Sequence, residues 1–403
     1  MTISRLELTN FTVFEKASFE FCPGINVLIG ENGTGKSHVL KAMYAAQKTA
    51  GPNDEESPTR STYVMLRKFI DLFRPEGRQL SRLVRRGDDE RSTIQVFDDA
   101  DRRASLSMQR GSRLFGGSNE LSTRDSVFVP PREVLAMYRG FVAAYEGREL
   151  DFDETYYDLC KALSAAPLRG ARAKEVKAML APLEQILGGK VVLEGDRFLV
   201  KQAEGHIEAH LVAEGLRKIA SIAYLVANGS LARDSVLLWD EPEAGLNPSL
   251  VVEVVEFLRT LAAGGVQVFL ASHDFLLVHR LSQTVEYPVE PAVPVRFFSL
   301  YRPDAEGPVE VERGDTLVDI EHNAILDEFA RYYDSEQVLA ARAMRGEAPT
   351  TLTLEPVRSS AKTKAAKTEA RAKKQPAKLT TRKAPASRAK ATARKATKKA
   401  TRG

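Results

Sequence analysis

The chain contains very few cysteines and no uninterrupted apolar run long enough to cross a membrane. Its 403 residues include only two cysteines, Cys22 and Cys160, which lie far apart, so neither a disulfide framework nor a cysteine metal site is expected. No basic-then-apolar leader is visible, and charged residues and glycines interrupt the most apolar region, 250–278. These absences predict a cytoplasmic protein with no membrane partner.

Aromatic and acidic residues are almost absent from the last part of the chain. Residues 357–403 contain 17 lysines and arginines, one acidic residue and no aromatic residue, a net charge of +16. Because the whole chain carries +4, the preceding 356 residues carry −12. A segment of this composition cannot bury enough apolar surface to fold, so we expect a disordered basic tail over 346–403. Its charge favours nucleic acid as a partner, and a solvated tail that binds nothing is the alternative.

The chain does contain a phosphate-binding motif at residues 30–37, Gly-Glu-Asn-Gly-Thr-Gly-Lys-Ser. The motif fits G-x-x-x-x-G-K-[ST] and lies between the apolar run 25–29 and a helix-like segment, 36–47. Glycines let successive N–H groups point inward, and the helix N-terminus adds partial positive charge, so the loop should cradle an anion. A glycine-rich turn with a solvated lysine is the alternative. The expected nucleotide-binding residues are Gly30, Asn32, Gly33, Thr34, Gly35, Lys36 and Ser37.

Four side chains are expected to carry the chemistry. Lys36 would reach the β- and γ-phosphates of ATP and assist catalysis, and the Ser37 hydroxyl would bind Mg²⁺. Asp240 and Glu241 end the short apolar run 236–239, and nucleotide sites of open α/β sheets lie at the carboxyl ends of such strands. We expect Asp240 to bind Mg²⁺ with Ser37, and Glu241 to polarise the attacking water. The pair predicts hydrolysis, and solvated acids at a strand end are the alternative.

The order of the expected elements predicts an α/β protein in four parts. Residues 1–50 should form the first part of an ATPase core, with a β-rich meander before the phosphate loop. Residues 51–210 should form an inserted α+β lobe of hairpins and helices, with one core strand near 126–130. The core resumes over 211–345, and the basic tail, 346–403, follows.

Two other groups of possible metal ligands have simpler explanations. Asp98, Asp99 and Asp101 lie between two strand-like segments and are typical of a hairpin turn. His206 and His210 are four residues apart, but they do not match H-E-x-x-H, and the residues around them alternate as on a strand. We expect no metal at either group.

After the phosphate loop, the chain resembles a known family. Residues 239–248, Trp-Asp-Glu-Pro-Glu-Ala-Gly-Leu-Asn-Pro, and 271–274, Ala-Ser-His-Asp, are similar to the Walker B, D-loop and switch-histidine series of ATP-binding-cassette (ABC) ATPases. The similar branch is soluble and includes SMC/RecF-type DNA-repair ATPases, the ATPase halves of overcoming-lysogenisation-defect nucleases, and AAA family ATPases of phage defence. The resemblance covers most of 1–345. It implies a P-loop NTPase head of the ABC type without a fused nuclease domain, in which His273 contacts the γ-phosphate and takes part in catalysis.

In that family, a signature sequence before the Walker B strand reaches across a dimer to the partner's nucleotide. Residues 211–220, Leu-Val-Ala-Glu-Gly-Leu-Arg-Lys-Ile-Ala, occupy this place and resemble the Ser-Glu/Asp-Gly-x-Arg variant. Ala213 replaces the usual serine, so a hydroxyl contact to the γ-phosphate is missing. The resemblance implies that Gly215 and the following helix N-terminus hold the partner's phosphate through N–H groups, and an ordinary helix start is the alternative.

Two features of the family have no clear counterpart in this chain. The family's glutamine-bearing loop would lie near residues 130–133, Pro-Pro-Arg-Glu, where Arg132 is a candidate for a nucleotide contact. Phe11 and Phe14 are the candidates for stacking on adenine. The base-binding side of the site is therefore the part that the sequence specifies least.

The motifs and the resemblance together predict a homodimeric ATPase that traps ATP and Mg²⁺ between two copies. Its hydrolysis is expected to serve DNA repair or maintenance, or anti-phage defence, acting on DNA or on a separate effector protein. A nucleotide-gated scaffold that holds a toxin or nuclease with little turnover is an alternative. The ATPase subunit of a membrane transporter is another, which the inserts, the irregular signature and the basic tail disfavour.

Overall fold

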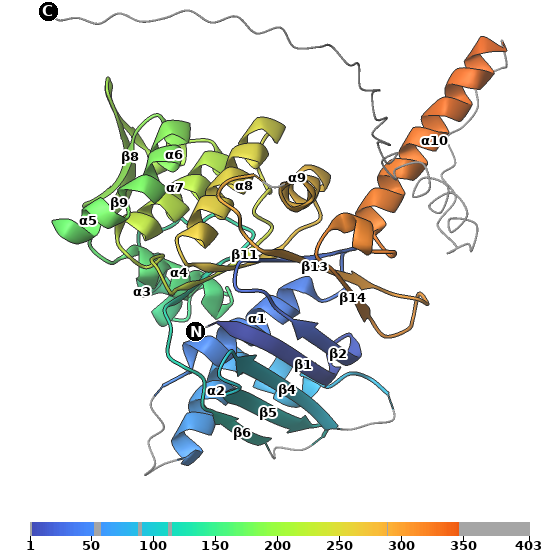
Figure 1. Ribbon diagram of the computed structural model, residues 1–403. Coiled ribbons are helices and arrows are strands. Elements are labelled where there is room, and N and C mark those ends of the chain that lie inside the picture. The colour runs from blue at the N-terminus through green and yellow to red at the C-terminus, as the bar shows by residue number, and fades with distance from the viewer. Residues whose placement is uncertain (1, 52–57, 88–90, 112–114, 288, 346–403) are drawn as a thin grey trace, which may run out of the picture. The chain divides into compact units, whose positions relative to one another are not determined.

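Figure 1 shows a computed structural model that describes residues 2–51, 58–87, 91–111, 115–287 and 289–345. All of these residues belong to one structural unit. The predicted basic tail, 346–403, lies outside the described residues. No helix in the described part of the chain is long and apolar enough to span a membrane.

A six-stranded sheet forms the centre of the fold. Its strands are β3 (Ile25–Gly30), β7 (Ser126–Val129), β11 (Val236–Asp240), β12 (Gln267–Ala271), β13 (Val295–Tyr301) and β14 (Glu310–Gly314). They lie in the order β14-β13-β3-β12-β11-β7, and all neighbours are parallel except β13 and β14. β3, β7, β11 and β12 are buried along their whole length, because the sheet is covered on both faces, and their sequences are therefore mostly apolar.

Side chains of this sheet point alternately into two hydrophobic cores. Val27 and Ile29 of β3 face one core, and Leu28, between them, faces the other. Trp239, the single tryptophan of the chain, lies in the first core, which helices cover (Figure 1). These helices are α3 (Phe141–Glu146), α4 (Glu154–Leu163), α6 (Lys177–Leu187), α7 (Glu214–Ala227), α8 (Pro248–Ala263) and α9 (Phe275–Glu286), and the short α5 (Ala171–Glu175), which has no buried residue, precedes α6.

The second core lies between the central sheet and a separate antiparallel sheet. Helices α1 (Lys36–Lys48) and α2 (Pro58–Phe73) pack here. The strands of the antiparallel sheet lie in the order β2-β1-β4-β5-β6. They are β1 (Ile3–Phe11), β2 (Phe14–Glu20), β4 (Arg91–Asp98), β5 (Arg103–Gln109) and β6 (Phe115–Asn119). The last described helix, α10 (Ala324–Met344), follows β14 and has no buried residue.

The segment predicted as an inserted lobe, 51–210, divides between these two cores. Its first half supplies β4, β5 and β6, which extend the N-terminal meander into one sheet because β4 pairs along β1. Its second half packs beside α7 and includes a small sheet in the order β10-β9-β8. The strands of this small sheet are β8 (Lys190–Glu194), β9 (Arg197–Gln202) and β10 (Gly205–Glu208). The two halves are joined through β7, the core strand expected near 126–130.

A hairpin forms around the aspartates 98–101, as the sequence predicted. β4 and β5 pair antiparallel, and their connection begins at Asp98. The Asp98 Oδ1 atom accepts hydrogen bonds from the N–H groups of Ala100 and Arg102, both at 3.0 Å. This carboxylate therefore stabilises the turn.

Candidate active site

Three neighbouring strands of the central sheet end at the residues that carry the predicted chemistry. β3 leads into the phosphate loop, β11 ends at Asp240, and β12 is followed by His273. β12 connects the other two, because the Ser272 N–H donates to a β3 carbonyl at 3.0 Å and the Glu241 N–H to a β12 carbonyl at 2.9 Å. Since the three strands are parallel, their carboxyl ends meet at one edge of the sheet.

Two glycines of the phosphate loop cannot be replaced without moving their neighbours. Gly30 and Gly35 have φ values of 144° and 91°, which favour glycine. A Cβ on Gly30 would lie 2.2 Å from the Leu300 oxygen, and one on Gly35 would lie 2.9 Å from the Phe14 ring. The loop is therefore held between β13 and the β1–β2 turn. Of the other predicted loop residues, Asn32 and Gly33 are exposed and Thr34 is buried.

Lys36 folds back over the loop. Its Nζ atom donates to the carbonyl oxygens of Gly30, at 2.7 Å, and Glu31, at 2.9 Å. Burial lowers the pKa of Lys36, and the charge of Asp240 is the largest of the effects that oppose this. The ammonium group is thus held over the loop, next to carboxylates, where a bound phosphate would meet it.

Ser37 and Asp240 are in contact. Asp240 is 4% exposed, and its burial raises its pKa to about 6, against which a hydrogen bond from the Ser37 side chain acts. A hydroxyl and a carboxylate are the hard oxygen ligands that Mg²⁺ prefers. A divalent cation between them would favour the ionised carboxylate and offset the effect of burial. The donor set therefore fits the predicted metal.

Glu241 has an unusual backbone conformation. Its φ is +52°, a left-handed value that residues other than glycine seldom adopt. Its N–H donates to β12 and its carbonyl accepts a hydrogen bond from the Lys218 Nζ atom at 3.2 Å, so this conformation is held from two sides. Its side chain is 35% exposed, and its Oε1 atom lies 3.9 Å from His273 Nδ1. The adjacent acids are thus separated: Asp240 is buried, and Glu241 remains open to water.

A third carboxylate, Glu243, belongs to the site, and the sequence reasoning missed it. Its Oε1 atom accepts hydrogen bonds from the Ser272 hydroxyl at 2.9 Å and from the His273 N–H at 3.1 Å. Burial raises the pKa of Glu243, and these hydrogen bonds oppose the rise. Its Oε2 atom has no hydrogen-bond partner within the described ranges. Glu243 therefore orients the switch-histidine loop, and its place in the string Asp-Glu-Pro-Glu was the only sequence signal for it.

Helix α7 brings two further charged residues to this edge of the sheet: Lys218, which no motif marked, and Arg217, which lies at the arginine position of the signature-like sequence. Lys218 is 1% exposed and donates to the Glu241 carbonyl. Burial lowers the pKa of Lys218, against the charges of nearby carboxylates. Arg217, beside it, forms an ion pair with Glu133 in the loop after β7, with 2.7 Å between Nε and Oε1. The start of α7 is therefore tied to the ends of both β7 and β11.

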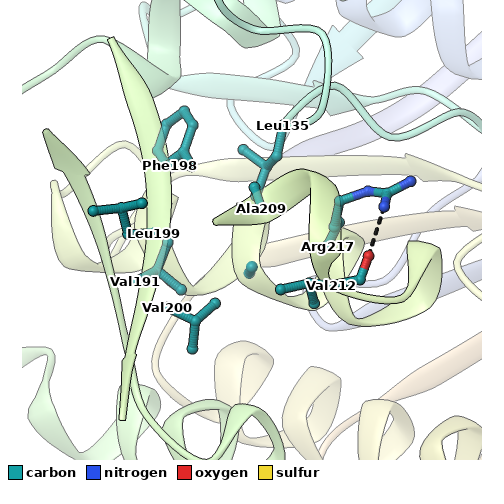
Figure 2. A pocket seen from close by; sticks show the side chains of 9 residues that line it. Leu135, Val191, Phe198, Leu199, Val200, Ala209, Val212 and Arg217 are labelled. Atoms are coloured by element: carbon teal, nitrogen blue, oxygen red, sulfur yellow. Dashed lines mark hydrogen bonds between the residues drawn. The ribbon is translucent and has the colours of Figure 1, made fainter. Parts of the chain in front are cut away.

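Figure 2 shows how the start of α7 is anchored on its other side. Arg217 donates from Nη1 to the Val212 carbonyl at 2.6 Å, and apolar side chains from β8, β9 and the loop after β7 pack beside it. Arg132, the residue that the sequence suggested in this loop, is exposed. Its contact with nucleotide stays a prediction.

Gly215 packs against the D-loop of its own chain. A Cβ on Gly215 would lie 2.4 Å from the Gly245 oxygen and 2.7 Å from the Leu246 side chain, so only glycine allows this approach. Gly215 is buried, whereas Ala213, the N-cap of α7, is exposed and provides no side-chain cap. This packing explains why residue 215 is a glycine, and no bound ligand is needed for the explanation. Contact of Gly215 with a partner's phosphate stays a prediction.

Phe11 and Phe14 cannot stack on adenine, so that prediction was wrong. Both side chains are wholly buried, Phe11 against Phe73 and Phe14 against Phe19. They belong to the core between the two sheets. Sequence proximity to the phosphate loop did not distinguish a core aromatic residue from an exposed one.

A basic hollow of about 290 Å³ lies at the β1–β2 turn, next to the position where the sequence predicted adenine binding. Thr12 and Val13 of the β1–β2 turn line it. Arg302, which follows β13, also lines it and donates from Nη2 to the Gly33 carbonyl at 3.2 Å, so the hollow adjoins the phosphate loop. The charged residues of its wall are Arg82, Arg85, Arg86, Arg302 and Glu306.

Known proteins are similar to this chain over part of its length. Residues 25–279, more than half of the chain, match the family described as "AAA domain, putative AbiEii toxin, Type IV TA system". The DNA replication and repair protein RecF of Lachnoclostridium phytofermentans is 27% identical over 143 residues, which cover 35% of this chain and 36% of that RecF. RecF of Bacillus velezensis is 34% identical over 85 residues, or 20% and 21% of the two chains. The chain thus matches at most 36% of the length of either of these relatives.

Solved structures of SMC heads are similar over more of the chain at lower identity. The SMC head bound to the C-terminal winged-helix domain of ScpA covers 79% of this chain and 98% of its own, with 13% identity and a TM-score of 0.49. The SMC head domain from Thermotoga maritima covers 78% and 99%, with 11% identity and a TM-score of 0.43. The family match over 25–279 and the RecF similarity carry the assignment: this chain belongs to that AAA-domain family of P-loop ATPases, as an ABC-type member of the SMC/RecF type.

Proposed function

We propose that this protein binds ATP with Mg²⁺ and hydrolyses it. The observation that carries the proposal is the convergence of Lys36, Ser37, Asp240 and Glu241 on one edge of the central sheet. The N–H groups of the loop would hold the phosphates, and Lys36 would exchange its two loop carbonyls for phosphate oxygens. Ser37 and Asp240 would hold the metal, which supplies charge neutralisation at the transferred phosphate.

Glu241 is the residue that we assign to the attacking water. Its carboxylate is open to solvent and can accept a proton, whereas Asp240 is buried beside Ser37. His273 is 51% exposed and its loop is held by Glu243, so its ring can donate to the γ-phosphate. The three carboxylates thus have different tasks: metal binding, proton acceptance and orientation of the histidine.

The basic hollow is suited to the nucleoside part of ATP. It adjoins the phosphate loop at two points, through the bond from Arg302 to Gly33 and through Val13, whose Cγ2 atom lies 2.8 Å from the place of a Cβ on Gly35. A nucleotide whose phosphates lie on the loop can therefore extend its ribose and base into the hollow. Guanidinium groups stack on aromatic faces, so arginine can take the place of an aromatic platform.

We further propose a homodimer that closes around two nucleotides and acts on DNA. The exposed start of α7, with Ala213 and Glu214 at its surface, supports the first part. The RecF relatives are named for DNA replication and repair, which supports the second. Nucleic acid could bind the body or the basic segment 357–403. The family description also names a toxin system, so a separate effector protein is the alternative partner.

The substitution Glu241→Gln tests this function. We expect turnover to fall by at least about 100-fold, because the proton acceptor is lost, while ATP binding persists. The variant should then accumulate as an ATP-dependent dimer in size-exclusion chromatography with light scattering. Glu253→Gln, on the exposed side of α8, is the matched control and should retain wild-type turnover. Full hydrolysis by Glu241→Gln would refute the role of Glu241, and absence of ATP binding by the wild type would refute the function.

A further inference from the structure

The molecule contains a buried lysine that phosphate binding does not require. Lys218 is 1% exposed, although burial disfavours a charged ammonium group. Its Nζ atom donates to the main-chain carbonyl of Glu241 at 3.2 Å. The charges of Glu214, Glu243 and Asp240 also act on it, so the ammonium group lies among the carboxylates of the site. The group that Lys218 hydrogen-bonds directly is the backbone carbonyl of Glu241, the acid that we assign to the attacking water.

The backbone of Glu241 has an unfavourable conformation that its neighbours must stabilise. Glu241 has a φ of +52°, and its N–H is bonded to β12 at 2.9 Å. The bond from Lys218 fixes the other end of the residue, its carbonyl. The peptide on each side of Glu241 is held, so the starting point of its side chain is fixed, and its Oε1 atom lies 3.9 Å from His273 Nδ1. Without the Lys218 bond, the carbonyl could rotate and carry the carboxylate away from the water that it must activate.

Lys218 also connects this acid to the signature helix. It lies one turn after Gly215, which packs against Gly245 of the D-loop. Its neighbour Arg217 forms an ion pair with Glu133 in the loop after β7. A displacement at the start of α7 would therefore move Lys218 and, through it, the Glu241 carbonyl.

We propose that Lys218 is a positioning residue that holds Glu241 in its catalytic conformation and links the start of α7 to it. The proposal rests on the proposed ATP hydrolysis only for its effect on turnover. The position of the Glu241 backbone can be measured without any reaction. The two proposals can therefore fail separately.

Lys218→Met tests this role, because methionine has a similar length and shape but no donor. We expect kcat to fall at least about 10-fold while the KM for ATP changes less than about threefold, since the phosphate-binding loop is untouched. Lys218→Arg, which keeps a cation and donors, should recover part of the lost kcat. Hydrogen exchange of the amides in 241–246 should become faster in Lys218→Met, in the absence of nucleotide.

Lys68→Met is the matched control. Lys68 is also a mostly buried lysine. It lies on α2 and forms ion pairs with Glu154 and Asp158, which are not residues of the candidate active site. This variant should lose thermal stability but keep wild-type kcat and wild-type exchange over 241–246. If Lys218→Met leaves exchange over 241–246 unchanged, the proposal is overturned, whatever the turnover. If the wild type hydrolyses no ATP, the proposed function fails, and the exchange measurement still decides the role of Lys218.

Discussion

Two buried lysines approach the same carboxylates from different helices, and they differ in what they contact. Lys36, on α1, donates to two carbonyls of the phosphate loop, and Lys218, on α7, donates to the carbonyl of Glu241. Burial lowers the pKa of both. Lys36 lies beside a loop that is open to solvent at its tip, whereas Lys218 is enclosed by protein. The same chemical group thus holds the phosphate loop in one place and the backbone of Glu241 in the other.

The two lysines also differ in how a sequence reveals them. Lys36 must follow the glycines of its loop at fixed spacing, because backbone N–H groups and the lysine act on the same phosphates. Lys218 needs only to be near Glu241 in space, and the two lie 23 residues apart in the chain. Chemistry directed at a ligand therefore imposes a local pattern, and support of a catalytic conformation does not.

The largest effect should come from Lys36→Met. Loss of its charge-assisted hydrogen bonds to phosphate should weaken ATP binding by about 10- to 100-fold. Lys218→Met should leave affinity nearly unchanged, so the two variants separate ligand contact from backbone support. Calorimetric titration with a non-hydrolysable ATP analogue measures both. An equal loss of affinity in the two variants would contradict the comparison.

Asp240→Asn should stabilise the protein in the absence of nucleotide, and only at neutral pH. Burial raises the pKa of Asp240 from 3.8 to about 6, so between these values the native state binds more protons than the unfolded state. Stability from this group therefore falls as pH rises from about 4 to about 6 and changes no further above that. Removal of the charge should raise the free energy of unfolding at pH 7.5 by up to about 3 kcal/mol and have little effect at pH 4.

Urea denaturation of both proteins at the two pH values checks this prediction. A stability difference that does not depend on pH would show that burial does not raise the pKa of Asp240. If so, the lysines would not be compensating a destabilised carboxylate, and the comparison between them would lose its electrostatic basis.

Gly215→Ala should reveal how closely the α7 end of the site is packed. Its Cβ would lie 2.4 Å from the Gly245 oxygen, so α7 or the D-loop must move, and we expect a destabilisation of about 1–3 kcal/mol. Gly116→Ala, in β6, where a Cβ meets nothing within 4 Å, is the control. Thermal unfolding of the two variants measures the difference. Comparable midpoints would mean that the start of α7 yields easily and cannot transmit a displacement to Lys218.

The smallest effect is expected from Arg302→Ala, on the ligand side of the comparison. Loss of one wall of the hollow should weaken ATP binding by a few-fold, about 1 kcal/mol, because one stacking or hydrogen-bonding group is removed. Inorganic tripolyphosphate, which has no nucleoside, should bind the variant and the wild type alike. A parallel loss for both ligands would place Arg302 at the phosphates and not at the nucleoside.

The parts of the fold that the sequence predicted are those with strong local patterns. The strand expected over 25–29 is β3, the run 236–239 is β11, and the core strand near 126–130 is β7. All three are short apolar runs that end at a turn signal. The assignment to the SMC/RecF-type family followed from the motifs at their ends, and it is confirmed by the family match together with the similarity to RecF.

The parts that the sequence did not reveal depend on contacts between distant segments. Pairing of β4 with β1 joins residues about 90 positions apart in the chain. The sequence therefore did not show that the first half of the expected lobe, 51–210, belongs to the N-terminal sheet. Lys218 is a buried charge without a motif. Glu243 lies inside the string 239–248, but the string gave it no role, and each residue is explained only by the group that it meets. Phe11 and Phe14 failed as base-stacking residues because alternation along a strand does not say which face is covered.

Trp239, buried in the helical core, is a natural fluorescent probe at the edge of the central sheet that carries the candidate active site. It is the only tryptophan of the chain, it is 1% exposed, and Asp240 follows it directly on β11. Its indole N–H has no hydrogen-bond partner among the described residues, and its side chain packs in the apolar core. The tryptophan fluorescence of the unlabelled protein therefore originates from one strand, next to the carboxylate on which a metal and nucleotide would act.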